Sequence, residues 1–252
     1  MHRYKLAFGA VLLAVFAAAA QCEQTLESVE NEVEALWAKI SAFTAKVTTD
    51  TNVPIGPVTV SSRATGTLEC LKKDGATLFR LDMVNKLDMG IPLAGPMEQK
   101  MLSVYDGKEI INEMEMMGTR QAFRMPPETA GKQGMTSGKS MFAAFRDKGD
   151  VTLRADATVD GKPVWVVEVV PNAATKKSAP TPVSLLKFYI SKENGLQVKT
   201  EVFDDKGEQT STSVYSDVVV DAKLAPERFV YTPPPGVTVQ EMSALKGKVP
   251  GL

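Results

Sequence analysis

The first element that the hydrophobic pattern predicts is an amphipathic helix. Within "TLESVENEVEALWAKISAFTAKV", residues 25–47, large apolar side chains recur every three or four positions, which places them on one helical face. Trp37 widens this face, and the opposite face is acidic. The apolar stripe consists of Leu26, Val29, Val33, Leu36, Ile40 and Phe43.

From Val47 onward the pattern changes to short runs in which apolar and polar residues alternate. Runs such as "VTVSSRATGTLECL" and "ATLFRLDMV" are typical of half-buried strands. Turn signals at Asp74-Gly75, Asp106-Gly107 and Gly118-Thr119 separate these runs. Because such connections are too short for crossover helices, the pattern predicts an antiparallel meander.

The same pattern returns in the second half of the chain after an interruption. Residues 126–140 form a polar loop, and a short helix follows whose apolar face consists of Met141, Phe142 and Phe145. Strands resume afterwards, and the stretch "NAATKKSAPTP" between them is expected to be disordered. A single helical stripe cannot cover roughly ten strands, so the sheet must curl over the helix.

The segment "FVYTPPPGVTVQ", residues 229–240, shows strand alternation on both sides of three prolines. Proline has no backbone N–H, so residues 233–235 cannot donate hydrogen bonds to a sheet. The segment is therefore expected at a sheet edge or as a strap that leaves the sheet. A plain turn that ends the strand, closed by Gly236, is the simpler alternative.

The N-terminus has the order of a secretory signal peptide, residues 1–20. Arg3 and Lys5 precede a short apolar run, and Ala18-x-Ala20 offers a cleavage site, so we expect export to the periplasm. Cleavage there leaves a soluble protein, whereas lipidation of Cys22 would anchor the protein to a membrane. A disulfide between Cys22 and Cys70 is a further alternative to a buried, reduced Cys70.

Charge and residue types exclude several classes of function. Removal of Arg3 and Lys5 from the 29 basic residues leaves 27 against 30 acidic ones, which argues against binding of nucleic acid. The same cleavage removes His2, the only histidine, so no histidine base or metal ligand remains. No paired acidic motif stands out. We therefore expect neither an enzyme nor a bound cofactor or metal.

Four stretches resemble the LolA-like family of periplasmic carriers for outer-membrane lipoproteins. They are "KISAFTAKVTTDT", "GTLECLKKDGATLFRLDM", "MLSVYDGKEI" and "APERFVYTPPPGVTV", and their order spans nearly the whole mature chain. The resemblance implies one domain, residues 21–252, folded as a mainly β (α+β) structure. In it, a curved antiparallel sheet forms an incomplete half-barrel around the N-terminal helix, with a short helical lid insertion. By this resemblance, the proline strap closes the open side of the half-barrel.

The resemblance also implies a function. A hydrophobic cavity would hold lipoprotein acyl chains or other lipids, received from an inner-membrane release complex and passed to an outer-membrane acceptor by a monomeric carrier. Glu69 and residues 72–74 stand where carriers have Trp and Arg-Pro. A lipid-anchored receptor or an envelope sensor with this fold, without carrier activity, therefore remains the alternative.

Alternation along the strands gives a candidate lining for this cavity, with Lys72 expected at its rim. Ten methionines crowd into one quarter of the chain, between Met83 and Met141, and flexible thioethers suit surfaces that accept varied apolar partners. Filling of irregular gaps in the core is the alternative role for them. The predicted lining is Leu36, Ile40, Phe43, Leu68, Phe79, Leu81, Met83, Leu102, Val104, Ile110, Met114, Met116, Phe123, Met125, Met141, Phe142 and Phe145.

Overall fold

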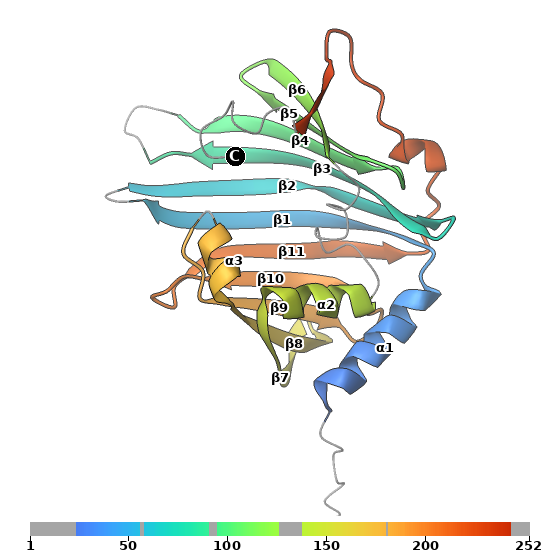
Figure 1. Cartoon of the computed structure of the whole chain (residues 1–252), viewed down its shortest axis with the longest axis vertical. Coiled ribbons are helices and arrows are strands. Elements are labelled where there is room, and N and C mark those ends of the chain that lie inside the picture. The colour runs from blue at the N-terminus through green and yellow to red at the C-terminus, as the bar shows by residue number, and fades with distance from the viewer. Residues whose placement is uncertain (1–23, 56–57, 91–94, 126–137, 180, 243–252) are drawn as a thin grey trace, which may run out of the picture.

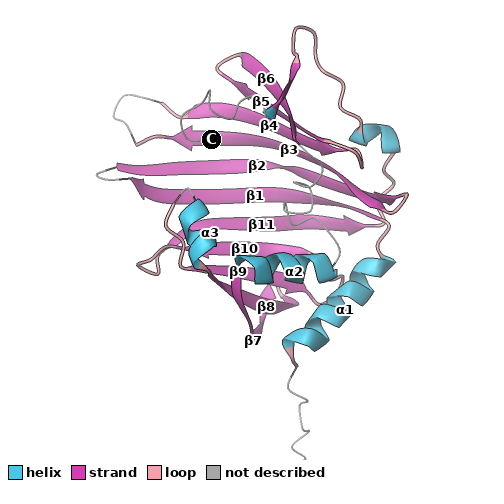
Figure 2. Cartoon of the chain, in the orientation of Figure 1, coloured by secondary structure: helices cyan, strands magenta, loops and turns pink. Residues whose placement is uncertain are grey.

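The computed structural model shows one curved, unclosed sheet of 12 strands with helices against one face (Figures 1 and 2). It describes residues 24–55, 58–90, 95–125, 138–179 and 181–242, so the predicted signal peptide and Cys22 lie outside the described residues. The strand order is β12-β6-β5-β4-β3-β2-β1-β11-β10-β9-β8-β7. Neighbouring strands are antiparallel except for β12, which runs parallel to β6. The predicted half-barrel fold is confirmed.

The strands β1 to β6 form one meander and β7 to β11 form another, whereas the last strand, β12, pairs with β6. The first set is β1 (Ala42–Ile55), β2 (Val58–Lys73), β3 (Ala76–Asp88), β4 (Met97–Tyr105), β5 (Ile110–Met116) and β6 (Thr119–Met125). The second set is β7 (Gly149–Val159), β8 (Lys162–Pro171), β9 (Leu185–Ser191), β10 (Gln197–Phe203), β11 (Gln209–Val220) and β12 (Val239–Glu241). The helices are α1 (Leu26–Lys39), α2 (Gly138–Lys148), α3 (Ala173–Ser178) and the 3-10 helix η3 (Pro226–Phe229).

Hairpin turns lie where the Asp-Gly signals predicted them. Asp74 and Gly75 have φ angles of 52° and 80°, which is the left-handed conformation that a tight two-residue hairpin requires. The third predicted turn is displaced by one residue, because Met117 and Gly118, with φ angles of 52° and 75°, occupy its centre. Apart from this displacement, the predicted meander is correct.

Two local predictions about helices are wrong. The helical stripe does not reach Phe43, because α1 ends at Lys39 and Phe43 belongs to β1. The backbone N–H and hydroxyl of Ser41 both donate to Asp221, at 3.0 and 2.9 Å, and this contact ties the start of β1 to the end of β11. The stretch expected to be disordered contains α3, whose N-terminus is capped by the side chain of Asn172.

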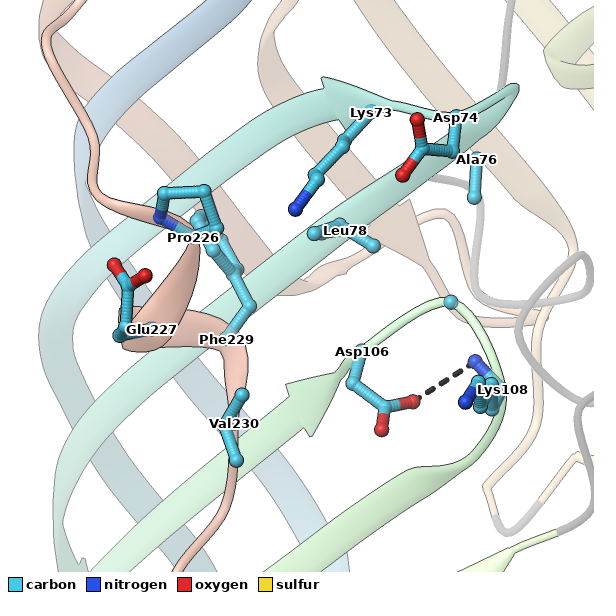
Figure 3. Close-up of a pocket in the computed structure, with 11 residues that line it drawn as sticks. Lys73, Asp74, Ala76, Leu78, Asp106, Lys108, Pro226, Glu227, Phe229 and Val230 are labelled. Carbon is cyan, nitrogen blue, oxygen red and sulfur yellow. Dashed lines mark hydrogen bonds between the residues drawn. The ribbon is translucent and has the colours of Figure 1, made fainter.

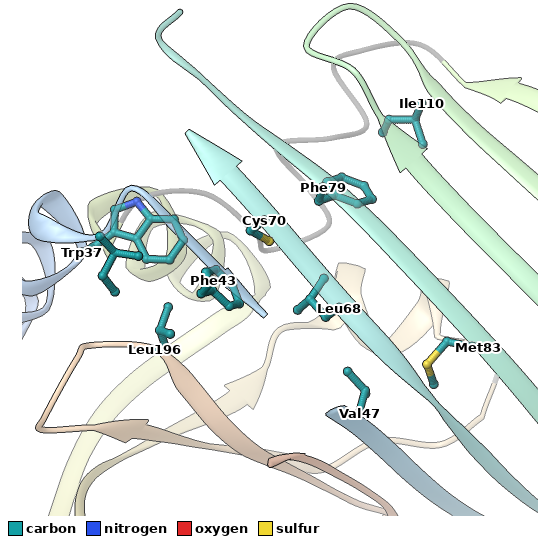
Figure 4. Close-up of a cluster of buried hydrophobic side chains, with 10 residues drawn as sticks. Trp37, Phe43, Val47, Leu68, Cys70, Phe79, Met83, Ile110 and Leu196 are labelled. Atoms are coloured by element: carbon teal, nitrogen blue, oxygen red, sulfur yellow. The ribbon is translucent and has the colours of Figure 1, made fainter. Parts of the chain in front are cut away.

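The hydrophobic core has two parts, which share the face of the sheet that packs on α1 and α2. We name this the inner face and the opposite one the outer face. The strand-side cluster (Figure 4) comprises Trp37, Ile40, Phe43, Val47, Leu68, Cys70, Phe79, Met83, Ile110 and Leu196. The helix-side cluster comprises Val29, Val33, Met141, Phe142, Phe145, Trp165, Val167, Val169, Phe188 and Ile190. Helix α2 thus covers the β8–β9 half of the inner face (Figure 1).

The C-terminal segment forms a strap, as the prolines predicted, but it crosses the outer face. Arg228 donates two hydrogen bonds to Glu69 of β2, at 2.8 and 2.7 Å, and Tyr231 donates to Glu113 of β5. The strap then pairs with β6 through Val239–Glu241. Glu69 alternates with the inward-facing Leu68 and Cys70, so the strap covers the side opposite the helices. The expectation that it closes the open side of the half-barrel is wrong, because its anchoring carboxylates point outward.

Candidate functional site

Exposed methionines gather on the inner face of β4 and β5. Met83 of β3 lies opposite Met101 of β4, which in turn lies opposite Met114 of β5, and Met116 follows on the same side of β5. Met101, Met114 and Met116 are 43%, 38% and 42% exposed, and we name these three the methionine patch. Grouped exposed apolar side chains often mark a binding surface. The crowding of methionine in the sequence was the signal for this site.

Met83 joins the methionine patch to the core beneath it. This side chain is only 8% exposed because it lies over Gly66 of β2, where a Cβ atom would come within 2.7 Å of the Met83 sulfur. Met83 also belongs to the strand-side cluster and lies on the same face of β3 as Phe79 (Figure 4). The patch is therefore the exposed border of a continuous apolar surface.

Two polar atoms beside the patch are buried without a hydrogen-bond partner among the described residues. They are the side-chain oxygen Oδ1 of Asn85 and the hydroxyl of Ser103. Asn85 lies two residues from Met83, and Ser103 lies two residues from Met101, so both point to the inner face. Buried polar atoms of this kind normally have a partner. A ligand or water at the patch would find both a donor and an acceptor here.

The predicted lining residues fall into several groups. In the strand-side cluster, Ile40, Phe43, Leu68, Phe79, Met83 and Ile110 are buried, and Leu81 and Met125 pack against them. In the helix-side cluster, Met141, Phe142 and Phe145 are buried, and Leu36 packs against them. Met114 and Met116 belong to the patch, and half-buried Phe123 lies opposite Asn112 on the inner face. That these residues line a lipid cavity stays a prediction.

Two of the predicted residues lie on the wrong face for that role. Leu102 pairs with Asp82 and Glu113, and Val104 lines a hollow under the strap, so both belong to the outer face. In the second half of β4 the inward residues are Met101, Ser103 and Tyr105, which lie opposite Met83, Leu81 and Phe79. Residues 101–105 carry apolar side chains on both faces, so alternation alone did not reveal which face is inner. Sequence analysis also missed Trp37 and Leu196 as neighbours of the lining.

Lys72 does not lie at a rim but holds the C-terminal end of α1. Its ammonium group is 4.5 Å from the centre of the Trp37 ring and donates to the Trp37 carbonyl oxygen. Burial lowers the pKa of Lys72, and the carboxylates of Glu34 and Asp221 partly offset this effect. The helix is thus fixed to the sheet by a cation–π contact and a hydrogen bond.

Cys70 is a structural residue of the core. Its thiol is free, it is 2% exposed, and burial holds its pKa above the usual range. A protonated, buried thiol is a poor nucleophile. The prediction of a buried strand residue is confirmed, whereas the alternative disulfide partner, Cys22, lies outside the described residues. Among the described residues, no group of His, Cys, Asp and Glu has the arrangement of a metal site.

A pocket of about 390 Å³ lies on the outer face beside η3 (Figure 3). Leu78, Pro226 and Phe229 form its apolar part, and the side chain of Lys73 extends over it. Charges of both signs line the pocket, from Lys73, Lys108, Asp74, Asp106 and Glu227. The carboxylate of Asp106 is already engaged by the backbone N–H groups of Lys108 and Glu109, at 2.8 and 2.9 Å. A pocket lined by both signs of charge favours neither an anionic nor a cationic ligand, so the methionine patch is the stronger candidate for a binding site.

The curved, unclosed sheet with helices over one face is an open half-barrel, and the apolar patch lies on its inner face. Several solved structures are similar to this chain. An uncharacterized conserved protein from Thermus thermophilus has a TM-score of 0.48 at 13% identity, covering 86% of this chain and 100% of its own. A putative outer membrane lipoprotein-sorting protein domain from Vibrio parahaemolyticus has a TM-score of 0.36 at 14% identity, covering 80% and 94%.

A LolA superfamily protein from Nitrosomonas europaea is also similar, with a TM-score of 0.30 at 14% identity, covering 82% of this chain and 98% of its own. The LolA-like family that the sequence resembles is thus represented among the matching structures. Similarity at TM-scores below 0.5 supports no statement about the ligands or partners of this chain. No protein-family model matches the chain, and no curated protein matches it. No described helix is long and apolar enough to cross a membrane.

Proposed function

We propose that this protein binds the acyl chains of lipoproteins or other lipids on the inner face of its sheet, within the cell envelope. The observation that carries the proposal is the methionine patch, where Met101, Met114 and Met116 are each about two-fifths exposed on neighbouring positions. Thioether side chains are flexible and polarizable, so they adapt to acyl chains of different length. The signal-peptide pattern of residues 1–20 supports a place outside the cytoplasm.

The size of the patch sets a requirement on the ligand. Complete burial of one methionine contributes about 1.5–3 kcal/mol, so covering three side chains that are two-fifths exposed contributes about 2–4 kcal/mol. Association itself costs at least about 4 kcal/mol. The patch alone therefore cannot hold a ligand tightly. An acyl chain has to reach the half-buried Leu81, Phe123 and Met125 on the same face as well.

The test is a titration of the purified protein with a fluorescent fatty-acyl probe, followed by competition with a diacylated and a matching unacylated peptide. Met101→Lys and Met114→Lys place a charge on the patch and should abolish saturable binding. Met117→Lys is the matched control, because Met117 is 82% exposed in the β5–β6 turn. Equal probe affinity in all variants, with the fold intact, would rule out the patch as the binding site.

Two roles are compatible with acyl binding, and the N-terminus distinguishes them. A free Gln21 would make a soluble carrier, which receives lipoprotein at the inner membrane and delivers it to an outer-membrane acceptor. An acylated Cys22 would make a membrane-anchored receptor or sensor. We propose the carrier role, which requires the first result, and mass spectrometry of the mature N-terminus decides between the two.

A further inference from the structure

We infer that the methionine patch is a reversible oxidation site, and that its sulfoxide form releases acyl chains. The oxidation itself depends only on the exposure of the thioethers, whereas its effect on ligand rests on the proposed function. The two parts are tested by separate measurements below.

The exposure of the methionines predicts an order of oxidation. Met101, Met114 and Met116 are 43%, 38% and 42% exposed, whereas Met83 is 8% and Met141 is 6% exposed. A dissolved oxidant therefore meets the patch well before it reaches the core, since oxidation of methionine follows access to the sulfur. Among the described residues, three of the five exposed methionines therefore lie together on the surface that we propose for ligand, and Met89 and Met117 lie outside it.

A further methionine, Met125, is protected in a different way. It is half-buried, and the side-chain nitrogen Nδ2 of Asn112 donates toward its sulfur. A sulfur lone pair engaged by a donor is less available to an oxidant. Met125 should therefore oxidise after the patch, although it lies on the same face.

The reaction is a two-electron oxygen transfer from a peroxide. A thioether lone pair attacks one oxygen of hydrogen peroxide, the S–O bond forms, and the O–O bond breaks. The hydroxide that leaves takes up the proton of the transferred hydroxyl group and becomes water. Methionine and hydrogen peroxide thus become methionine sulfoxide and water. Methionine sulfoxide reductases reverse the change with a thiol reductant.

The sulfoxide changes what the patch can bind. Its oxygen is a strong hydrogen-bond acceptor, and an acyl chain lying over it offers no donor. A buried polar group without a partner weakens an equilibrium by about tenfold or more, so several sulfoxides should abolish detectable binding. Met83 and the rest of the strand-side cluster stay reduced, so the fold is retained.

The first measurement is peptide mass mapping of the purified protein during graded treatment with hydrogen peroxide. We expect sulfoxide at Met101, Met114, Met116 and the turn residue Met117 before it appears at Met83, Met125 or Met141. Simultaneous oxidation of all methionines, or oxidation of Met83 first, would overturn the assignment.

The second measurement is the affinity for a fatty-acyl probe before and after the same treatment. Wild type should lose affinity by about tenfold or more, without a change in its circular dichroism, and regain it with reductases of both epimer specificities. The triple variant Met101→Leu, Met114→Leu, Met116→Leu has no thioether left in the patch, so its affinity after peroxide should equal its own affinity before treatment. The Met117→Leu variant should behave as wild type.

Two outcomes would refute the link to binding. One is oxidised wild type that binds the probe as before, and the other is a triple variant that is as sensitive to peroxide as wild type. Failure of the untreated protein to bind any acyl probe would instead refute the proposed function and the link that rests on it. The peptide mass map would still test whether the methionine patch oxidises before the core.

Discussion

Phe229 should be the residue that holds the C-terminal strap on the sheet. It is fully buried, and it lines two hollows of the outer face, of about 390 and 230 Å³, beside Leu78, Val104 and Ile111. Truncation of a buried phenylalanine to alanine costs about 3–5 kcal/mol. Because the two hollows open to solvent, water can fill the space that the ring leaves, and we expect the lower value of about 3 kcal/mol.

The ion pairs of the strap do not compensate for this loss. Arg228 is half exposed, so its pair with Glu69 contributes only about 0–1 kcal/mol. Urea unfolding followed by circular dichroism measures the difference between wild type and Phe229→Ala. The matched control is Val230→Ala, since Val230 is 60% exposed and should change stability by less than about 0.5 kcal/mol.

Two results would refute this reasoning. A loss below about 1 kcal/mol for Phe229→Ala would mean that the ring does not anchor the strap. A parallel loss of acyl-probe affinity in the folded variant would contradict the separation of the faces, because the strap lies on the side opposite the methionine patch.

Three further predictions concern the sheet and α1. Gly66→Ala should lower the free energy of unfolding in urea by about 1–3 kcal/mol or more, since the new Cβ would lie 1.9 Å from a backbone oxygen and 2.7 Å from the Met83 sulfur; an unchanged unfolding curve would refute this packing. Lys72→Ala should cost about 1 kcal/mol and speed hydrogen exchange in α1, whereas Lys73→Ala should do neither; equal effects would contradict the proposed anchor. Burial alone would raise the pKa of Glu168, but hydrogen bonds from β7 and β9 hold this pKa below 4.5. The stability that the ionised Glu168 contributes is therefore complete above pH 4.5 and is lost as the pH falls through the lower pKa of the folded protein. An unfolding midpoint that stays constant from about pH 6 to strongly acidic pH would disprove this.

The parts of the fold that depend on local chemistry could be predicted from the sequence. Asp74-Gly75 adopts the left-handed turn that this pair of residues favours. Alternation also placed Phe79 and Met83 on the inner face correctly. These features need only neighbours within a few residues.

The parts that depend on distant contacts could not be predicted. Ile40 continues the helical period, but the helix ends before it, where Ser41 meets Asp221 from 180 residues away. The same limit applies to β4. In this strand the strap buries Val104 on the outer face as completely as the core buries residues on the inner face. Both faces of β4 therefore carry apolar residues, and the alternation of apolar and polar positions does not indicate which face is inner.

The central claim is that acyl chains bind on the inner face at the methionine patch, and photolabelling tests it most directly. A fatty acid that carries a diazirine near its terminal methyl group is equilibrated with the protein, irradiated, and located by peptide mass spectrometry. We predict labels on β4 and β5 at Met101, Met114 or Met116, which an acylated peptide prevents and an unacylated peptide does not. Labels confined to the outer-face pocket around Phe229 and Val230, or labels that an acylated peptide fails to displace, would contradict the claim.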